Sequence, residues 1–377
     1  MQTTTLLAGI PAENASLFHR MPLSVGDPAA WIQVDDETTV IVRDIEVDRA
    51  RRQLTANHFG SPGEYAPAGG LSPDRATATA QAVAEFLARK KIASIQTDRT
   101  LPFIFAWHIQ QAGIEIAYNA DLGVIDRRSK SDRELECLQT AQEMTQRAME
   151  LACRTIAAST ANASGQLVHE GELLTSERVK AIAAQFFLEH NFAMEHGSIV
   201  ATAPEVADCH HAGAGPLRTE VPIVVDLFPR DLSSRYWGDC TRTVVHGQAS
   251  EEVKHMHAAV VQAKAAATAA LRVGNTGDAV HQASTDVLLD RGYPLSRGTV
   301  TDHPSIQHGT GHGIGLEIHE PILLDDGGPE ILPNEVLTIE PGLYGRKVGG
   351  VRVEDMVAAT TDGPVVFGTL HQGLDWK

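Results

Sequence analysis

The sequence predicts an α+β protein with two domains, a smaller α/β domain over residues 1–128 and a larger one over residues 129–377. A chain of 377 residues with 43% hydrophobic content is long enough to form two hydrophobic cores. Strand-like and helix-like segments alternate in the first third, and the polar run DRRSKSD, residues 126–132, then leads into a long amphipathic segment. Strand-like runs that contain acidic residues follow in the second domain.

Short strands and one long helix are expected in the first domain. Strand-like sequence covers residues 31–35 and 38–42, and a helical pattern covers residues 77–91. The segments IASIQTD (92–98) and IEIAY (114–118) favour further strands, because β-branched and aromatic residues pack well on a pleated surface.

The second domain opens with a helical pattern over residues 133–152, in which apolar residues recur at helical spacing. A helix is expected around residues 176–190, and alanine-rich helices between residues 251 and 291. The strand candidates are PIVVDLF (222–228), TRTVVHG (241–247), NEVLTIEPGLY (334–344) and GGVRVEDMVAA (349–359).

The segment HGTGHGIGLEIHE, residues 308–320, combines three histidines with four glycines. Four glycines inside a helix would cost roughly 4 kcal/mol relative to alanine, which excludes a zinc-binding helix with His308 and His312 one turn apart. In an extended segment, His308 and His312 lie on one face and His319 on the other. We therefore expect a bulge or turn that brings the three imidazoles together. The alternative, a loop of exposed polar histidines, suits a lone histidine better than this cluster.

Composition excludes several classes of partner. The net charge of −17 disfavours nucleic acid and anionic membrane surfaces, because cationic residues dominate binding to both. No apolar run reaches the roughly 20 residues of a membrane span, and the first residues lack the pattern of a signal peptide. The four cysteines, at positions 137, 153, 209 and 240, are scattered and predict reduced thiols. A cytoplasmic location is expected.

Four acidic residues lie at strand-like positions of the second domain: Asp226, Asp239, Glu340 and Glu354. Burying an unpaired charge costs several kcal/mol, so an acidic residue in a β-branched run needs a cation. Together with His312, the four carboxylates indicate a metal site.

One imidazole and four carboxylates offer enough donors for two divalent ions, and their negative charges balance two M²⁺. Such ions lie about 3.5–4 Å apart, share a bridging water and lower its pKa for attack on a carbonyl. Oxygen-rich ligation with one histidine suits Mn²⁺, and Co²⁺, Fe²⁺ and Zn²⁺ remain open alternatives. The pattern predicts metal-assisted hydrolysis.

The order of these five residues resembles the ligand pattern of the pita-bread metallopeptidases, which include methionine aminopeptidase, aminopeptidase P and prolidase. The resemblance covers roughly residues 130–360 and is carried by YWGDCTRT, GTGHGIGLEIHE, TIEPGLY and GVRVED. The first domain is similar to the amino-terminal domain of the aminopeptidase P, prolidase and creatinase branch. The resemblance therefore implies a pita-bread catalytic domain preceded by a creatinase-type α/β domain.

The resemblance also implies a role for each ligand. Asp226 would bind one metal ion, while Asp239 and Glu354 would bridge both ions. His312 and Glu340 would hold the second ion, and Glu340 would also shuttle the proton of the attacking water. The segment between Asp226 and Asp239 is slightly longer than is common in the family, which could reshape the pocket.

Further catalytic residues follow from the same resemblance. His308, His319 and one histidine of CHHAGAGPL would bind the substrate carbonyl or the developing oxyanion. His210 is preferred to His211, because the branch pattern places its histidine before xxGxGPL. Arg352 resembles an arginine that orients the bridging carboxylate.

The leading hypothesis is an Xaa-Pro peptidase that cleaves the bond before proline, at the amino end of peptides or dipeptides, by attack of a metal-bridging hydroxide. The sequence does not separate aminopeptidase P from prolidase activity. Two alternatives use the same fold: a creatinase-like amidinohydrolase that works without metal, and a non-catalytic binding module. The complete set of five ligands argues against both.

The resemblance implies a homodimer to which the amino-terminal domain contributes. Trp107, in FIFAWHIQ, resembles an aromatic residue that some relatives send into a neighbouring subunit's active site. A tryptophan of the hydrophobic core is the alternative interpretation.

Overall fold

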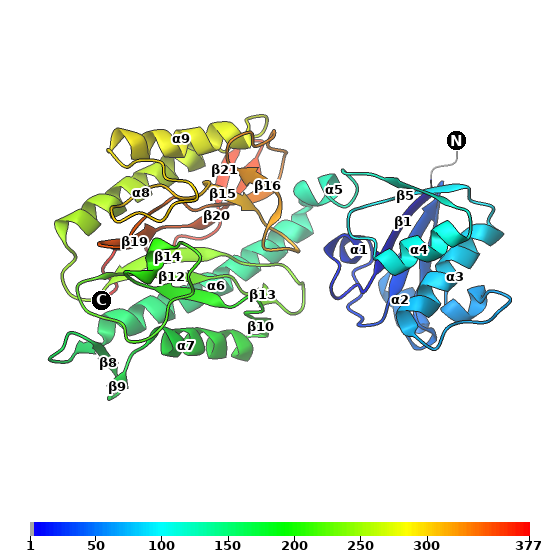
Figure 1. Cartoon of the computed structure of the whole chain (residues 1–377), viewed down its shortest axis with the longest axis horizontal. Coiled ribbons are helices and arrows are strands. Elements are labelled where there is room, and N and C mark those ends of the chain that lie inside the picture. The colour runs from blue at the N-terminus through cyan, green and yellow to red at the C-terminus, as the bar shows by residue number, and fades with distance from the viewer. Residues whose placement is uncertain (1–3) are drawn as a thin grey trace. The chain divides into compact units, whose positions relative to one another are not determined.

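The structure, a computed structural model, describes residues 4–377. The chain forms two compact units that divide between Arg127 and Arg128, and Figure 1 shows both. The expected α+β class, with an α/β domain first, is confirmed. No helix within residues 4–377 has the length and apolar composition that crossing a bilayer requires.

The first unit is built on a six-stranded mixed sheet in the order β4-β3-β2-β1-β5-β6. Its strands are β1 (Thr4–Gly9), β2 (Ala29–Val34), β3 (Glu37–Ile41), β4 (His58–Gly60), β5 (Ser94–Thr97) and β6 (Glu115–Tyr118). Its helices are α1 (Ala15–Arg20), α2 (Val47–Gln53), α3 (Arg75–Arg89) and α4 (Phe103–Gln111), with 3₁₀ turns η1 (Asp44–Glu46) and η2 (Pro62–Tyr65).

Helix α3 forms where the apolar spacing predicts one. Its N-cap is Asp74, whose carboxylate accepts a hydrogen bond from the Thr77 N–H, so the helix begins slightly before the predicted start. Ala80, Val83 and Leu87 recur at three- and four-residue spacing and are fully buried in the core of this unit.

Trp107 lies outside that core. Its side chain is 48% exposed, and Phe103, one helical turn earlier in α4, is 76% exposed. The core interpretation of Trp107 is therefore wrong. Residues four apart are neighbours on a helix surface, so the two aromatic side chains share one exposed face of α4.

The second unit holds most of the strands. They are β7 (Thr160–Ala161), β8 (Leu167–His169), β9 (Glu172–Leu173), β10 (Phe192–Ala193), β11 (Ser198–Ala201), β12 (Pro222–Leu227), β13 (Arg230–Asp231), β14 (Cys240–Val245), β15 (Gly311–Gly313), β16 (Glu320–Leu324), β17 (Glu335–Ile339), β18 (Gly342–Gly345), β19 (Gly349–Arg352), β20 (Asp355–Thr360) and β21 (Gly363–Val366). The helices from the junction onward are α5 (Ile125–Arg128), α6 (Asp132–Ala158), α7 (Ser176–Glu189), η3 (Glu205–Ala207), α8 (Glu251–Ala270) and α9 (Gly277–Asp290).

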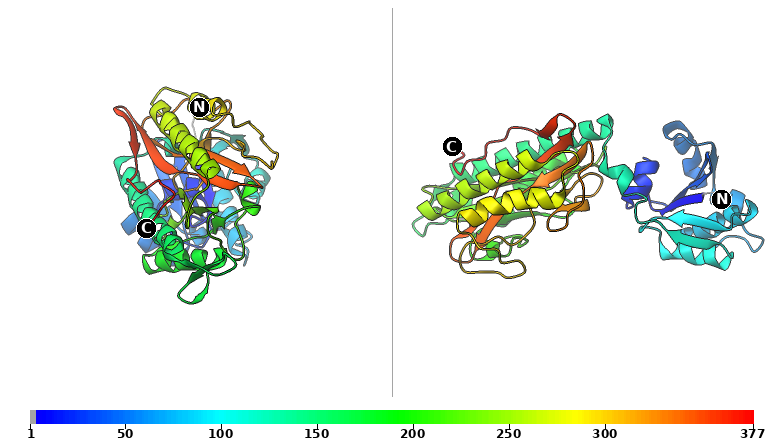
Figure 2. Two further views of the ribbon diagram at one scale, coloured as in Figure 1. Left: turned by 90° about the vertical axis from the view of Figure 1, so that its left-hand side faces the viewer. Right: turned by 90° about the horizontal axis from the view of Figure 1, so that it is seen from above.

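Three groups of strands position the site: the sheet β11-β12-β14, the sheet β16-β15-β17-β20-β21 and the ribbon β18-β19. Helices α6 and α7 pack on the first sheet, and α8 and α9 pack against strands of the second sheet and the ribbon. Figures 1 and 2 show the strands between the two helix pairs. The sheets therefore have helices outside them, and their inner strands are buried.

Helix α6 is longer than the pattern over residues 133–152 predicted. A capping box fixes its start, since the Ser131 hydroxyl accepts from the Glu134 N–H and the Glu134 carboxylate accepts from the Ser131 N–H. Met149, Cys153 and Ile156 are fully buried, so the apolar face continues to the end of the helix.

Two segments predicted as single strands are each divided in two. The chain leaves the five-stranded sheet after Ile339 and enters the ribbon at Gly342, and it returns between Arg352 and Asp355. Pro341 lacks an N–H and restricts the preceding residue, so a central strand cannot continue there. The divisions fall at Glu340 and at Glu354, so each carboxylate lies where the chain changes sheets.

The expected kink in the glycine–histidine segment is confirmed. The register of β15 against β16 shifts between His312 and Gly313, and residues 314–319 then form a turn before β16. Gly311 must be glycine for steric reasons, because a Cβ atom there would lie 2.0 Å from the Thr338 carbonyl oxygen. The close approach of these backbones places the His312 side chain beside the end of β17.

Candidate active site

A single cavity of about 680 Å³ in the second unit collects the residues that the sequence singled out. The proposed ligands on its wall are Asp226, Asp239, His312, Glu340 and Glu354, and the proposed catalytic residues are His210, His308, His319 and Arg352. His211 is not among the described residues that line it, and its Nδ1 atom accepts a hydrogen bond from the Gly213 N–H.

Each proposed ligand occupies a defined place in the sheets. Asp226 lies within β12, and Asp239 directly precedes β14. His312 lies in β15, Glu340 directly follows β17, and Glu354 lies between β19 and β20. The five side chains thus come from both sheets and from the crossings between the second sheet and the ribbon.

Asp239, His312 and Glu354 bring their donor atoms into one compact group. One donor atom from each lies within 4.8 Å of the others, and all three residues are buried. The Nε2 atom of His312 is 3.7 Å from Oδ2 of Asp239 and 3.5 Å from Oε1 of Glu340. Donor atoms at these separations can share one cation.

His312 is in the form that binds a metal. Its Nδ1 atom lies 3.0 Å from the Gly313 carbonyl oxygen, and a carbonyl only accepts, so Nδ1 carries the proton. Burial, with the neighbouring His319, lowers the pKa of His312 to about 3. The ring is therefore neutral, with the Nε2 lone pair facing the carboxylates.

Asp239, Glu340 and Glu354 are in an environment that favours the neutral form of a carboxyl group unless cations are present. Burial, followed by the neighbouring carboxylates, raises the pKa of Asp239 and of Glu354 well above their usual ranges. Burial also raises the pKa of Glu340 to about 7. The Oδ1 atom of Asp226 is buried without a hydrogen-bond partner among the described residues. A divalent cation would satisfy these groups, so the residues fit a metal centre.

Arg352 joins several parts of the site. Its Nη2 donates to Oδ2 of Asp226 at 2.6 Å, its Nη1 to the Tyr344 hydroxyl at 2.9 Å, and its Nε to the Thr241 hydroxyl at 3.1 Å. Thr241 in turn donates to Oε2 of Glu354 at 2.7 Å. Arg352 therefore contacts the Asp226 carboxylate directly and reaches the Glu354 carboxylate through the Thr241 hydroxyl.

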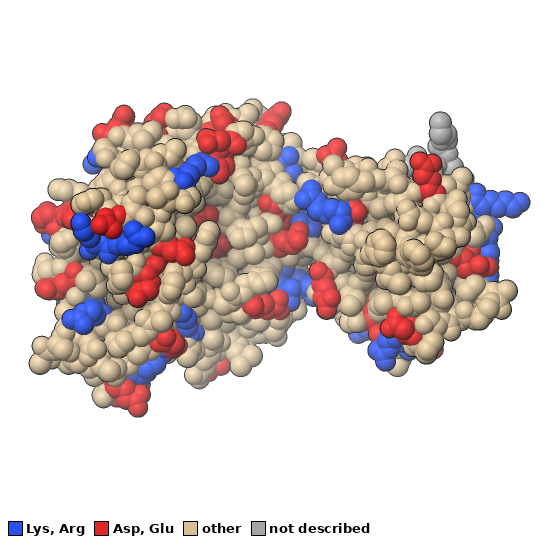
Figure 3. Space-filling model, in the orientation of Figure 1, with Lys and Arg blue, Asp and Glu red and all other residues tan. Residues whose placement is uncertain are grey.

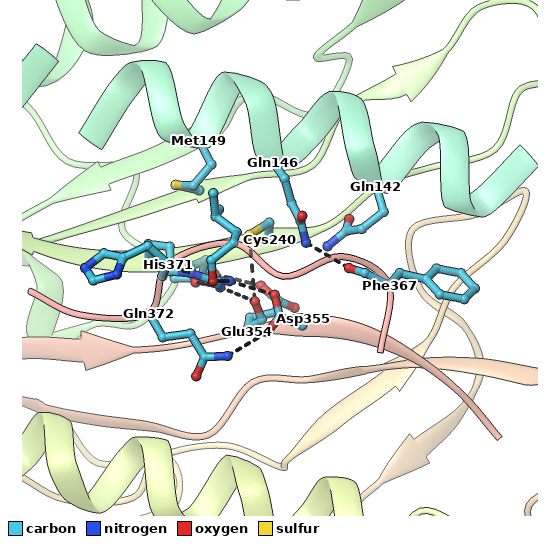
Figure 4. A network of polar contacts seen from close by, with 12 residues as sticks. Gln142, Gln146, Met149, Cys240, Glu354, Asp355, Phe367, His371 and Gln372 are labelled. Atoms are coloured by element: carbon cyan, nitrogen blue, oxygen red, sulfur yellow. Dashed lines mark hydrogen bonds and ion pairs between the residues drawn. The ribbon is translucent and has the colours of Figure 1, made fainter. Parts of the chain in front are cut away.

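A buried cluster of hydrogen bonds and ion pairs fixes the backbone of Glu354, and Figure 4 shows this network. Arg242, which is fully buried, donates to the Glu354 carbonyl oxygen and, at 2.7 Å, to Oδ1 of Asp355. Lys264 donates to the other oxygen of Asp355. Arg242 also donates to the carbonyl oxygen of His371, so the final segment of the chain supports the same strand.

Asp239 is fixed by α6. The Gln142 side chain donates to the Asp239 carbonyl oxygen at 2.8 Å and accepts from the Asp239 N–H at 2.9 Å. Sequence reasoning missed both Gln142 and Arg242. A signal existed for each, since Gln142 lies on the buried face of the predicted helix and Arg242 is a charge inside a β-branched run.

The other two histidines of the glycine-rich segment, the half-buried His308 and the exposed His319, differ in their contacts. The ring of His319 meets that of His312 edge-on, with centroids 4.2 Å apart. His308 donates from Nδ1 to the Gly309 carbonyl and accepts at Nε2 from the Tyr344 hydroxyl at 2.8 Å. Both ring nitrogens of His308 are thus engaged within the protein, which departs from its expected role as a donor to the substrate.

The segment between Asp226 and Asp239 shapes the cavity. Phe228 lines the wall, and Trp237 stacks on His196, another lining residue, with ring centroids 5.1 Å apart. Sequence reasoning also missed His196, because EHGSIV offers no pattern that distinguishes it from a surface histidine.

The fold and the site define a metal-dependent hydrolase. Residues 136–361 match the model of metallopeptidase family M24. The chain belongs to this family, and its catalytic unit has the pita-bread fold that the sequence motifs implied.

Similar proteins include several peptidases. An uncharacterized peptidase of Bacillus subtilis is 37% identical over 142 residues, which cover 37% of this chain and 38% of that protein. The Xaa-Pro dipeptidase of Pyrococcus horikoshii is 27% identical over 283 residues, 74% of each chain. The alignment with the probable dipeptidase PepE of Mycobacterium tuberculosis spans 51% of that protein. The chain thus spans less than two thirds of the length of PepE and of the Bacillus subtilis peptidase.

A solved structure shows that the fold extends beyond the family's motifs. The Xaa-Pro dipeptidase from Bacillus anthracis superimposes with a TM-score of 0.81 at 22% identity, over 99% of this chain and 94% of that one. Both units of the chain therefore have counterparts in a known architecture.

Proposed function

We propose that the protein is a dinuclear metallo-exopeptidase that hydrolyses the Xaa-Pro bond at the amino end of peptides or dipeptides. The observation that carries the proposal is the convergence of four carboxylates and a neutral imidazole in one cavity. Relatives named Xaa-Pro dipeptidase and Xaa-Pro aminopeptidase support the substrate class, and the proposal includes both activities.

In this proposal, Asp226, Asp239, His312, Glu340 and Glu354 would together hold two divalent ions. Mn²⁺ is the proposed metal, with Co²⁺, Fe²⁺ and Zn²⁺ as alternatives of similar ligand preference. When bound, the ion pair lowers the pKa of a water molecule and polarises the scissile carbonyl. A carboxylate oxygen of Glu340 takes the proton of the attacking water.

The remaining residues bind and orient. His319 and His210 lie on the cavity wall and would donate to the carbonyl oxygen as negative charge develops there. Arg352 fixes Asp226 directly and Glu354 through Thr241, so the two carboxylates keep their separation. His308 supports this arrangement through the Tyr344 hydroxyl.

Substrate preference tests the proposal. Chelated protein reloaded with Mn²⁺ should hydrolyse Gly-Pro or Gly-Pro-Gly at least about tenfold faster than the matched alanine peptide, because even one methylene group changes the rate by about 10–200-fold in an apolar pocket. Chromatography of the products gives both rates. Equal rates for the proline and alanine peptides would contradict the proposal, and hydrolysis of creatine instead would favour the amidinohydrolase.

We further propose a homodimer to which the first unit contributes. Phe103 and Trp107 expose a shared apolar face on α4, and Figure 3 shows an area without charged side chains where Figure 1 places that helix. Light scattering at micromolar concentration should give twice the chain mass of 40.5 kDa. Replacing both aromatic residues by serine should shift the protein toward monomer, and a fully active wild-type monomer would end this idea.

The proposed compartment is the cytoplasm. All four cysteines are free in the structure, and Cys153 and Cys240 are buried in hydrophobic surroundings. Free thiols are typical of a reducing compartment.

A further inference from the structure

Two buried ion pairs connect residues 128–130, which directly precede α6, to the second sheet. Lys130 Nζ lies 2.8 Å from Oε2 of Glu320, and these side chains are 2% and 3% exposed. Arg128, two residues earlier, donates from Nη2 to Oε2 of Glu335 at 2.9 Å, and that pair is 9% and 2% exposed. The two pairs are matched in burial, in charge and in the chain segment that supplies the cation.

Each glutamate also closes a loop. Oε1 of Glu320 accepts from the Leu316 N–H at 3.0 Å, and Oε2 of Glu335 accepts from the Leu332 N–H at 2.9 Å. A charged acceptor on a backbone N–H makes a stronger hydrogen bond than a neutral one. Both loops are therefore fixed by a carboxylate whose charge a buried cation balances.

The loops differ in what they carry. The loop closed by Glu320 contains His319, whose ring packs against His312, whereas the loop closed by Glu335 carries no residue that lines the described cavity. Trp237 reinforces the first loop, since its backbone N–H donates to the Gly315 carbonyl and its Nε1–H to the Leu316 carbonyl, both at 3.1 Å. A Cβ atom on Gly315 would lie 2.5 Å from Oε1 of Glu320, so the turn is built tightly around that carboxylate.

We propose that Lys130 and Glu320 are positioning residues for the hydrolysis: their buried ion pair fixes the turn that holds His319 against the metal site. Arg128 and Glu335 form the equivalent pair with a structural role alone. The inference rests on the proposed function, in which His319 donates to the substrate carbonyl. It adds two residues that touch neither substrate nor metal.

The physical reason is the fate of an uncompensated buried charge. Without the Lys130 ammonium, the buried Glu320 carboxylate loses the cation that lies 2.8 Å from its Oε2, and a carboxylate that is no longer balanced there holds its place beside the Leu316 N–H less firmly. The turn then loses its closure, and His319 moves relative to His312. A misplacement of about 1 Å in a positioning group can lower the rate by about a hundredfold.

The test compares Lys130→Met and Glu320→Gln with the matched controls Arg128→Met and Glu335→Gln. All four variants should lose stability in urea, but only the first two should lower kcat/KM on Gly-Pro peptides, by about ten- to a hundredfold. Lys130→Arg, which keeps the cation, should restore most of the rate. Equal losses of kcat/KM in the two pairs would overturn the proposal.

A double-mutant cycle tests whether the pair acts through His319. Lys130→Met should lower kcat/KM much less in a His319→Ala background than in the wild type, because the group that it positions is already absent. An equal loss in both backgrounds would show that the pair acts elsewhere. Should Lys130→Met fail to fold, Glu320→Gln takes its place, since the amide removes the ion pair with little change in side-chain size and is a weaker acceptor for the Leu316 N–H than a carboxylate.

A spectroscopic measurement separates this inference from the proposed function. With ¹³C-labelled histidine, the His319 ring signal, assigned by its loss in His319→Ala, should shift in Lys130→Met and stay in place in Arg128→Met. The same result in an enzyme inactive on Xaa-Pro peptides would refute the substrate class and keep the positioning role. An unshifted signal in Lys130→Met would refute the positioning role whatever the activity.

Discussion

Glu340→Gln should lower kcat by at least about a hundredfold while leaving the protein folded, since general-base catalysis contributes about 10²–10⁴-fold. An amide cannot take the proton of the attacking water, and it binds metal more weakly than a carboxylate. Glu340 is suited to this role by position, because it directly follows β17 and its Oε1 lies 3.5 Å from Nε2 of His312. Turnover and metal content measured on the same preparation check the prediction.

The matched control is Glu330→Gln, an exposed glutamate before the same strand, which should keep wild-type turnover. If Glu340→Gln kept more than about a tenth of the wild-type kcat, it would have lost less than about 1.4 kcal/mol of transition-state stabilisation. That outcome would remove Glu340 from the mechanism. A large loss of turnover with full metal content would assign Glu340 to proton transfer more than to ligation.

Adding Mn²⁺ or Co²⁺ to chelated protein should raise the melting temperature. A ligand that binds only the native state stabilises it by RT ln(1 + [L]/Kd), about 2.7 kcal/mol at a hundredfold excess over Kd. The effect should be large here, because buried carboxylates of like charge repel one another or hold protons until cations arrive. Asp239 and Glu354, whose pKa values are raised, should release protons on binding.

Two histidine variants separate metal binding from substrate binding. His312→Ala should abolish most of the melting shift, because Nε2 of His312 faces the carboxylates. His210→Ala should keep the shift and lose turnover, since His210 lies on the cavity wall and is not one of the five proposed ligands. Calorimetry on the chelated wild type and both variants, with and without added metal, measures the melting shift of each protein. A His312→Ala protein that responds to metal like the wild type would show that the ions bind elsewhere.

The sequence predicted the site better than it predicted the elements around it. Burial of an acidic residue requires compensation wherever it occurs, so Asp226 or Glu354 in a β-branched run is informative without knowledge of the fold. The glycines of residues 308–320 were equally informative, because they exclude a helix and permit the close approach seen at Gly311. Local patterns of this kind do not depend on which distant segments pair in the fold. All nine proposed site residues line the same cavity.

What the sequence could not show is pairing between distant segments. Lys130 and Glu320 are far apart in the chain, and the sequence around each residue does not indicate which residue it pairs with. The same holds for Arg242 and Asp355, and for the contact of Arg352 with Asp226. The strand divisions at Glu340 and Glu354 also depend on which sheet the chain joins next, which periodicity alone does not encode.

The most direct test of the account is the number of metal ions that the chelated protein binds. Isothermal titration with Mn²⁺ should give two ions per chain, with proton release that varies with the ionisation enthalpy of the buffer. Restoration of Gly-Pro hydrolysis should follow occupancy of both sites. Binding of two ions with recovered hydrolysis is the predicted result. Full hydrolysis of Xaa-Pro peptides without bound metal, or no binding in wild type, would contradict a dinuclear site made by these five residues.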